Sequence, residues 1–79
     1  MDKDQQDVKK FLEEQLEWSK DQARILDKMN VKLLEMKRIA QYVVDHELSA
    51  IEMKSLNSQL NDLKNEFHVL EKQLHSVVH

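Results

Sequence analysis

The sequence predicts an all-α protein, an antiparallel two-helix hairpin of the coiled-coil type that pairs with a second copy as a homodimeric four-helix bundle. Three observations carry this prediction. The 79 residues contain no glycine and no proline, which tight turns normally use. An uninterrupted apolar heptad runs through the C-terminal part, and a helix-start signal stands just before it. We expect one hairpin over residues 1–79, with helices at about 4–45 and 49–78 and a turn at about 45–48.

The second helix is predicted by the spacing of its apolar residues. They recur at alternating steps of three and four, which places them all in a narrow stripe along one side of a helix. Such a stripe has to be covered by another helix. Its members are Met53, Leu56, Leu60, Leu63, Phe67, Leu70, Leu74 and Val77.

The turn is marked by a capping box that begins at Ser49. The Ser49 hydroxyl can accept from the Glu52 amide, and the Glu52 carboxylate can accept from the Ser49 amide. Asp45 or His46 has to end the first helix in the role that glycine usually takes. The connection is then only three or four residues long, which makes the two helices antiparallel.

The first helix is predicted to begin after an Asp2 or Asp4 cap and to run on without interruption. Ser19 and Gln22 resemble a second capping box, but no turn residue accompanies them, so a continuous helix is favoured over a break at Trp18–Ser19. This helix has its own row at steps of three and four. The row consists of Ser19, Gln22, Leu26, Met29, Leu33, Met36, Ala40 and Val43.

Folding the first helix back on the second brings the two rows into layers. Leu33 then falls opposite Leu63, and Lys32 falls opposite Glu66. An exposed ion pair contributes only ~0.2–1 kcal/mol, so such pairs select the orientation and the apolar rows supply the stability. The predicted hairpin core is Leu26, Met29, Leu33, Met36, Val43, Met53, Leu56, Leu60, Leu63, Phe67, Leu70 and Leu74.

The first helix has more apolar residues than one partner helix can cover. Residues 4–18 are expected to overhang the open end of the hairpin, and further apolar residues lie beside the row. A helix that is apolar on so wide an arc is typical of a larger bundle. Whether a second copy or a different protein covers this surface stays open. The predicted interaction surface is Phe11, Leu12, Trp18, Ile25 and Ile39.

The charge is unevenly distributed along a chain of net charge −3. Residues 1–19 carry three Lys and six Asp or Glu, residues 20–40 carry six Lys or Arg and three acids, and residues 41–79 carry three Lys and six acids. Pairing between subunits accounts for this pattern more simply than a nucleic acid does. A basic stripe could still contact phosphates. It consists of Lys20, Arg24, Lys28 and Lys32, extended by Lys37 and Arg38.

No motif for catalysis or for a cofactor is present, and the chain has no cysteine. Two thin helices offer no concave pocket in which to shift a carboxylate pKa, so we expect no enzyme, no catalytic residue and no cofactor. His68, His75 and His79 share a helix face with Glu71, and histidines four residues apart can chelate a metal. That face is exposed and the last turn frays, so solvated histidines are the favoured interpretation.

These observations predict a small protein–protein interaction module or regulator that acts by binding and self-associates. The alternatives are a nucleic-acid-associated regulator using the basic stripe and a small binding-only inhibitor of another protein. No apolar run approaches the ~18 residues that a membrane span needs, so a cytoplasmic protein without membrane contact is expected.

The stretch from Ile25 to Leu74 resembles the helical hairpin near the N-terminus of bacterial flagellins. In both, a helix is followed by a short polar turn and a capped leucine heptad, and here the first helix contains Met36-Lys-Arg-Ile-Ala40. The resemblance implies a hairpin fold, and no function is carried over from it.

Overall fold

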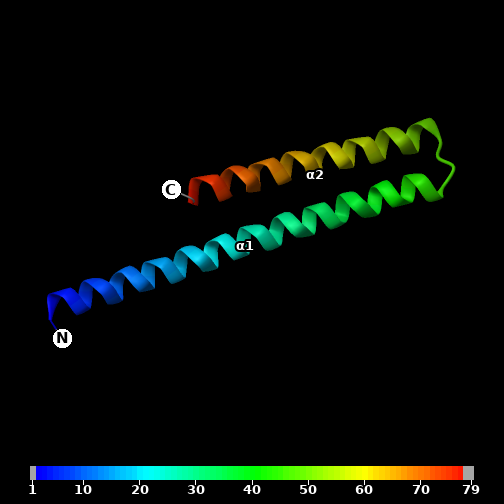
Figure 1. The fold of residues 1–79 in the computed structure, drawn as a ribbon. Coiled ribbons are helices and arrows are strands. Elements are labelled where there is room, and N and C mark those ends of the chain that lie inside the picture. The colour runs from blue at the N-terminus through cyan, green and yellow to red at the C-terminus, as the bar shows by residue number, and fades with distance from the viewer. Residues whose placement is uncertain (1, 78–79) are drawn as a thin grey trace.

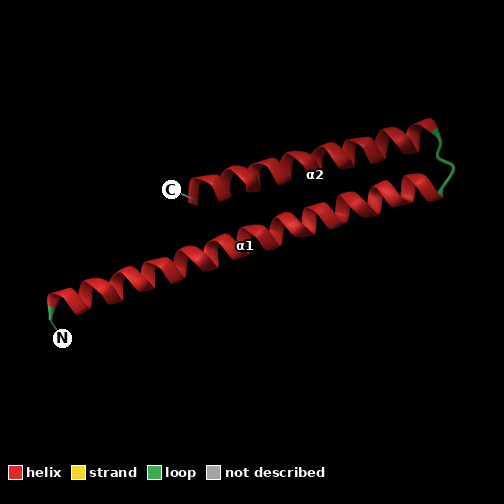
Figure 2. Cartoon of the chain, viewed as in Figure 1, coloured by secondary structure: helices red, strands yellow, loops and turns green. Residues whose placement is uncertain are grey.

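The computed structural model describes residues 2–77 and contains two α-helices, α1 (Lys3–Asp45) and α2 (Ala50–Val77). They lie side by side and run antiparallel (Figure 1). The described residues form no strand, and a short loop joins the helices at one end (Figure 2). The molecule is a rod measuring 70 × 19 × 12 Å, because a hairpin of two long helices is two helices wide and one helix deep.

The N-terminus of α1 is capped by Asp2. Its side chain accepts from the backbone N–H of Gln5 at 2.9 Å, which satisfies one of the amides that a first turn leaves without a partner. The acidic Asp4 in the first turn faces the positive end of the helix dipole. From there α1 runs for 43 residues, through Trp18 and Ser19, without a break.

The predicted capping box at the start of α2 is confirmed. The Glu52 amide donates to the Ser49 hydroxyl oxygen at 3.2 Å, and the Ser49 amide donates to Oε1 of Glu52 at 3.5 Å. The Ser49 hydroxyl also donates to this carboxylate at 3.1 Å. Ser49 therefore caps a helix that begins at Ala50.

The end of α1 shows how a chain without glycine makes this turn. His46 has extended backbone angles, φ −129° and ψ 144°, and no described residue has a positive φ. Nδ1–H of His46 donates to the carbonyl of Tyr42 at 2.9 Å, and the two rings stack with centroids 4.0 Å apart. A side-chain donor thus satisfies a last-turn carbonyl that a left-handed residue normally serves through its backbone.

The core lies along the contact line of the helices and is thin. Leu63 and Leu70 of α2 are buried, each 9% exposed. Lys32 of α1 and Glu66 of α2 form the ion pair predicted between the helices, with Nζ and Oε2 2.8 Å apart. The antiparallel alignment derived from the sequence is confirmed at this pair.

Half of the predicted row of α1 faces α2, and the other half does not. Leu26 and Leu33, predicted in the hairpin core, are each 48% exposed, and Ala40 is exposed as well. Ile25 and Ile39, predicted on the interaction surface, are half-buried and line grooves beside α2. The half-buried residues of α1 at steps of four and three are Trp18, Gln22, Ile25, Met29, Lys32, Met36, Ile39 and Val43.

The physical reason lies in the two flanks of one row. Gln22, Met29, Met36 and Val43, here called the shared row, belong to both the predicted and the observed face. An apolar residue lies beside this row on either flank, so hydrophobic burial alone does not choose between them. In the structure the flank that carries Ile25, Lys32 and Ile39 faces α2, and Lys32 contacts Glu66 there.

The predicted residues of α2 lie along the same contact line. Leu56, Leu60, Phe67 and Leu74 are half-buried, while Met53 near the turn is 36% exposed. Val77 ends the helix. The predicted extension of α2 to residue 78 lies outside the described residues.

Candidate interaction surface

The N-terminal part of α1 extends past the end of α2 (Figure 1). Every residue from 3 to 17, here called the overhang, is exposed. Its apolar side chains are between 56 and 60% exposed, which is unusual for a cluster on one helix. They are Val8, Phe11, Leu12 and Leu16.

Three of these side chains form one patch. Val8, Leu12 and Leu16 are spaced by four residues and therefore lie one above the other along the helix. They line a shallow groove with the aliphatic parts of Lys9 and Glu13. Lys9 and Glu13 form an exposed ion pair at 3.9 Å, so charged groups edge an otherwise apolar strip.

The apolar strip continues from the overhang onto the hairpin. Leu26 and Leu33 lie 14 and 21 residues after Leu12, and a seven-residue repeat returns to nearly the same side of a helix. We call Leu12, Leu26 and Leu33 the leucine stripe. Beside it lie Met29 and Met36 of the shared row, which α2 leaves half-exposed. The stripe has the spacing of a helix-packing surface, and α2 does not cover it.

The other side of the hairpin is charged. Three shallow grooves follow the contact line there, and Leu26 and Leu33 line none of them. Val31, Val69 and Leu70 are the apolar members of one groove, with Lys32 and Glu66 beside them. The other charged residues of these grooves are Asp21, Arg24, Lys28, Glu35, Arg38 and Asp62. This side of the hairpin is therefore rich in charged residues, and the leucine stripe lies away from its grooves.

The structure separates the residues predicted for the interaction surface into two groups. Phe11 and Leu12 lie on the overhang and are 57% and 60% exposed. Ile25 and Ile39 lie between the helices, and Trp18 is half-buried at the junction of the overhang with the hairpin. Leu26 and Leu33 take the places of the two isoleucines on the available surface. Sequence reasoning had assigned these leucines to the hairpin core because their heptad spacing suits either surface.

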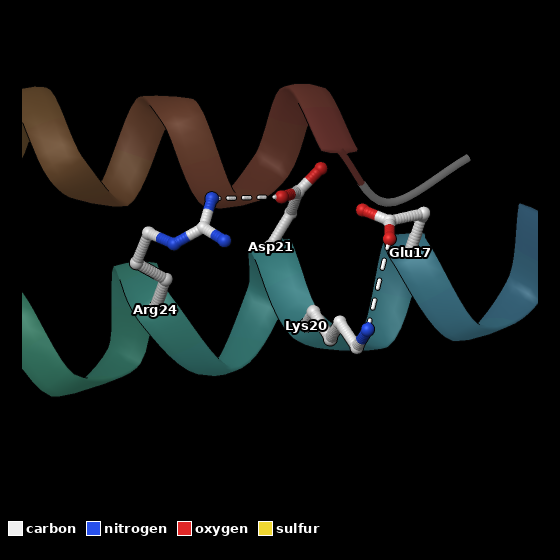
Figure 3. A network of polar contacts seen from close by, with 4 residues as sticks. All are labelled: Glu17, Lys20, Asp21 and Arg24. Carbon is white, nitrogen blue, oxygen red and sulfur yellow. Dashed lines mark hydrogen bonds and ion pairs between the residues drawn. The ribbon is translucent and has the colours of Figure 1, made fainter.

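The basic stripe is interleaved with acids that pair with it. Nζ of Lys20 lies 3.7 Å from Oε1 of Glu17, and Nη1 of Arg24 lies 3.0 Å from Oδ1 of Asp21 (Figure 3). Such exposed pairs contribute only ~0–1 kcal/mol, so their effect is on surface potential more than on stability. An approaching phosphate would meet a carboxylate beside each of these bases.

Lys32 differs from the other bases because its partner lies on α2. The hydrogen bond to Glu66 raises the pKa of Lys32 above its ordinary value of 10.5, the charges of Glu66 and Glu35 act in the same direction, and partial burial opposes them. The ammonium is therefore held in its charged form by the hairpin itself.

The described residues contain no group of three or more side chains that could hold a metal ion. His68 lies 3.6 Å from Glu71 through Nδ1 and Oε1, and His75 is in the last turn of α2. His79 lies outside the described residues. No polar or charged side chain within residues 2–77 is buried, so none there is desolvated in the way that acid–base catalysis uses.

Comparison with protein-family models, curated proteins and solved structures gives no match to this chain. The resemblance to the flagellin hairpin therefore leads to no family assignment. Across the described part of the chain, neither helix combines the length and the apolar character that crossing a bilayer requires.

Proposed function

We propose that this chain is a small protein–protein interaction module that acts by binding and self-associates as a homodimeric four-helix bundle of the coiled-coil type. The observation that carries the proposal is the leucine stripe. Three leucines at heptad spacing, with a valine and a leucine beside the first, are left in water by α2. Such a surface is typical of proteins whose function is contact.

The burial of apolar surface favours association. Full burial of a leucine side chain contributes ~1.5–3 kcal/mol, and among the residues that the structure describes the hairpin alone buries only Leu63 and Leu70, each to 9% exposure. A chain of 79 residues is in the size range where oligomerisation commonly supplies the missing core. Covering the leucine stripe gives the rod the second layer that it lacks.

A second copy is the preferred partner because the chain is complementary to itself. The segment 1–19 is acidic and the segment 20–40 is basic, each by three charges. An arrangement with two-fold symmetry brings unlike segments together twice. The binding-only inhibitor remains an alternative in which a different protein takes this place.

Nucleic-acid binding is the less favoured function. Lys20, Arg24 and Lys32 each have a carboxylate within 3.7 Å, and the chain is acidic overall. A polyanion would have to displace these carboxylates from the bases, and the displaced negative charges would stay close to it.

Light scattering on the purified chain tests the proposal. We expect a mass of about twice 9.4 kDa at micromolar concentration, falling to the monomer mass on dilution. The double variant Leu26→Gln/Leu33→Gln is expected to be monomeric while its circular dichroism stays helical. A wild-type chain that is monomeric at high micromolar concentration would refute self-association and leave a different protein as the partner.

A matched control is available on the charged side. Val31 and Val69 are 49% and 55% exposed, close to the values for the two leucines. Val31→Gln/Val69→Gln removes a similar amount of exposed apolar surface, and we expect it to remain dimeric. Equal weakening by both double variants would show non-specific stickiness in place of a defined surface.

A further inference from the structure

We infer that the overhang of one copy lies antiparallel on the leucine stripe of a second copy, with Leu12 opposite Met29 and Val8 opposite Leu33. This inference rests on the proposed self-association and changes its geometry, because the dimer then consists of two three-helix units joined end to end in place of one four-helix bundle. The two-fold axis then crosses α1 between residues 20 and 21. Each hairpin receives a third helix, which is the overhang of the other copy.

Heptad packing allows only a few alignments of two antiparallel α1 helices. A residue of the leucine stripe has to meet a residue of the shared row, because antiparallel seams pair the two different core positions. The apolar members of the shared row that Leu12 can lie opposite are therefore Met29, Met36 and Val43, in steps of seven. These three alignments differ in which segment of the second copy lies beneath the overhang.

Charge distinguishes the three alignments. Residues 3–19 carry three Lys and five acids, a net charge of −2. With Met29 opposite Leu12 they lie over residues 22–38, whose five bases and two acids give +3. With Met36 they lie over residues 29–45, at +1. With Val43 only residues 10–19 lie over α1, at residues 36–45 and +1, and residues 3–9 extend past its end. Only the first alignment sets the acidic segment on the most basic one.

The layers of the same alignment also match in polarity. Val8 meets Leu33 and Leu12 meets Met29, so apolar side chains cover apolar side chains. Near the axis Ser19 meets Gln22, and two polar side chains can satisfy one another there. Gln15 meets Leu26 in a mixed layer, where the methylene stem of the glutamine supplies the contact.

Other alignments match less well. The Met36 alignment sets Ser19 against Met29 and Gln22 against Leu26. The Val43 alignment places Val8 past Asp45, the last residue of α1, so that no helix lies opposite it. Charge and polarity therefore select the same alignment independently.

This geometry gives the unequal helix lengths a role. The overhang of 15 residues spans roughly 22 Å at about 1.5 Å per residue, and in this alignment it lies over residues 24–38 of the second copy. Those residues hold Leu26 and Leu33 together with Met29 and Met36. The part of α1 that α2 cannot reach is thus the part that completes the other hairpin.

Cysteine cross-linking tests the alignment, and the native chain has no cysteine to interfere. In Leu12→Cys/Met29→Cys the two thiols are 17 residues apart on one straight helix, roughly 25 Å. A disulfide needs Cα atoms within about 7 Å, so any bond has to join two chains. We expect mild oxidation to convert this variant to a covalent dimer on a non-reducing gel.

The matched controls are Leu12→Cys/Met36→Cys and Leu12→Cys/Val43→Cys, since Met29, Met36 and Val43 are all half-buried members of the shared row. We expect little covalent dimer from either. If the wild-type mass is dimeric, preferential cross-linking of a control variant would overturn this alignment and leave self-association intact. The absence of cross-linking in all three variants would do the same. A monomeric wild-type mass would instead refute the proposed function.

Salt provides a second readout that needs no variant. Because the alignment pairs segments of opposite charge, the dimer should weaken as sodium chloride is raised from low to molar concentration. Light scattering across that range measures the shift. A dimer that strengthens steadily with salt would contradict the charge selection, since apolar contact alone responds in that direction.

Discussion

Two pairs of leucines show what distinguishes the two helices. Leu63 and Leu70 on α2 are seven residues apart and 9% exposed, whereas Leu26 and Leu33 on α1 are seven residues apart and 48% exposed. Residue type, spacing and helical context are the same. The difference is that one pair faces the other helix of the chain and the other pair faces solvent.

The comparison teaches that heptad spacing identifies a packing surface without identifying its partner. On α2, polar residues flank the apolar row on both sides, so only one rotation of that helix buries it. On α1 the shared row has apolar residues on both flanks, and a single partner covers only one of them. The surplus on α1 is a property of its sequence, and it becomes visible as a surface once α2 is in place.

Truncating one leucine from each pair has the largest expected effect on stability. Leu63→Ala should lower the free energy of unfolding by ~2–5 kcal/mol, as for a buried leucine. Leu33→Ala should cost about 1 kcal/mol or less at concentrations where the chain is monomeric, because half of that side chain is already in water. Urea unfolding followed by circular dichroism measures both values.

Protein concentration sharpens this test. If the leucine stripe packs against a second copy, the cost of Leu33→Ala should rise with concentration while that of Leu63→Ala changes little. Equal costs for the two variants at high dilution would contradict the difference in burial between α1 and α2.

Breaking the cap of α2 should have an intermediate effect. Ser49→Ala removes the hydroxyl that accepts from the Glu52 amide and should cost ~0.5–2 kcal/mol. Thermal unfolding measures it, and Ser55→Ala within α2 is the control, since an exposed mid-helix serine makes no cap. An equal loss of stability in the two variants would show that the capping box contributes nothing special.

The ion pair between the helices should have the smallest effect, seen as a dependence on pH. The pKa of Lys32 is raised in the folded hairpin, so its stabilising contribution is fully present below the unfolded value of 10.5 and is lost as pH rises through the folded value. The stability difference between wild type and Lys32→Met should therefore shrink above that range.

Lys28→Met provides the comparison for this experiment. Lys28 lies one turn away along the same groove, and its removal should not produce this alkaline dependence. Unfolding measured between neutral and strongly alkaline pH tests both variants. A difference between wild type and Lys32→Met that stays constant across the range would show that the Lys32–Glu66 contact does not act through the charge on Lys32.

Local sequence signals determined the elements and their order. The absence of glycine and proline predicted long helices, and a cap at Asp2 or Asp4 and the Ser49–Glu52 capping box predicted where they begin. The caps act through hydrogen bonds between residues three positions apart, so they depend on the local sequence and not on the tertiary fold. The short connection and the Lys32–Glu66 pairing predicted the antiparallel alignment for a similar reason, since loop length and heptad spacing leave little freedom.

The candidate surface could be predicted only in part. Phe11 and Leu12 were identified because the longer first helix has to extend past the second, and this follows from element lengths. Leu26 and Leu33 were assigned to the hairpin, while Ile25 and Ile39 were assigned to the surface. Both assignments depend on how α1 is rotated about its own axis.

That rotation is what the tertiary structure decided. A turn of α1 by one heptad position exchanges two apolar flanks of similar hydrophobicity, so the sequence holds no local preference between them. In the folded hairpin α2 lies against the flank that carries Ile25, Lys32 and Ile39, and Lys32 contacts Glu66 there. Once α2 occupies that side, the leucine stripe faces solvent, and another chain is needed to bury it.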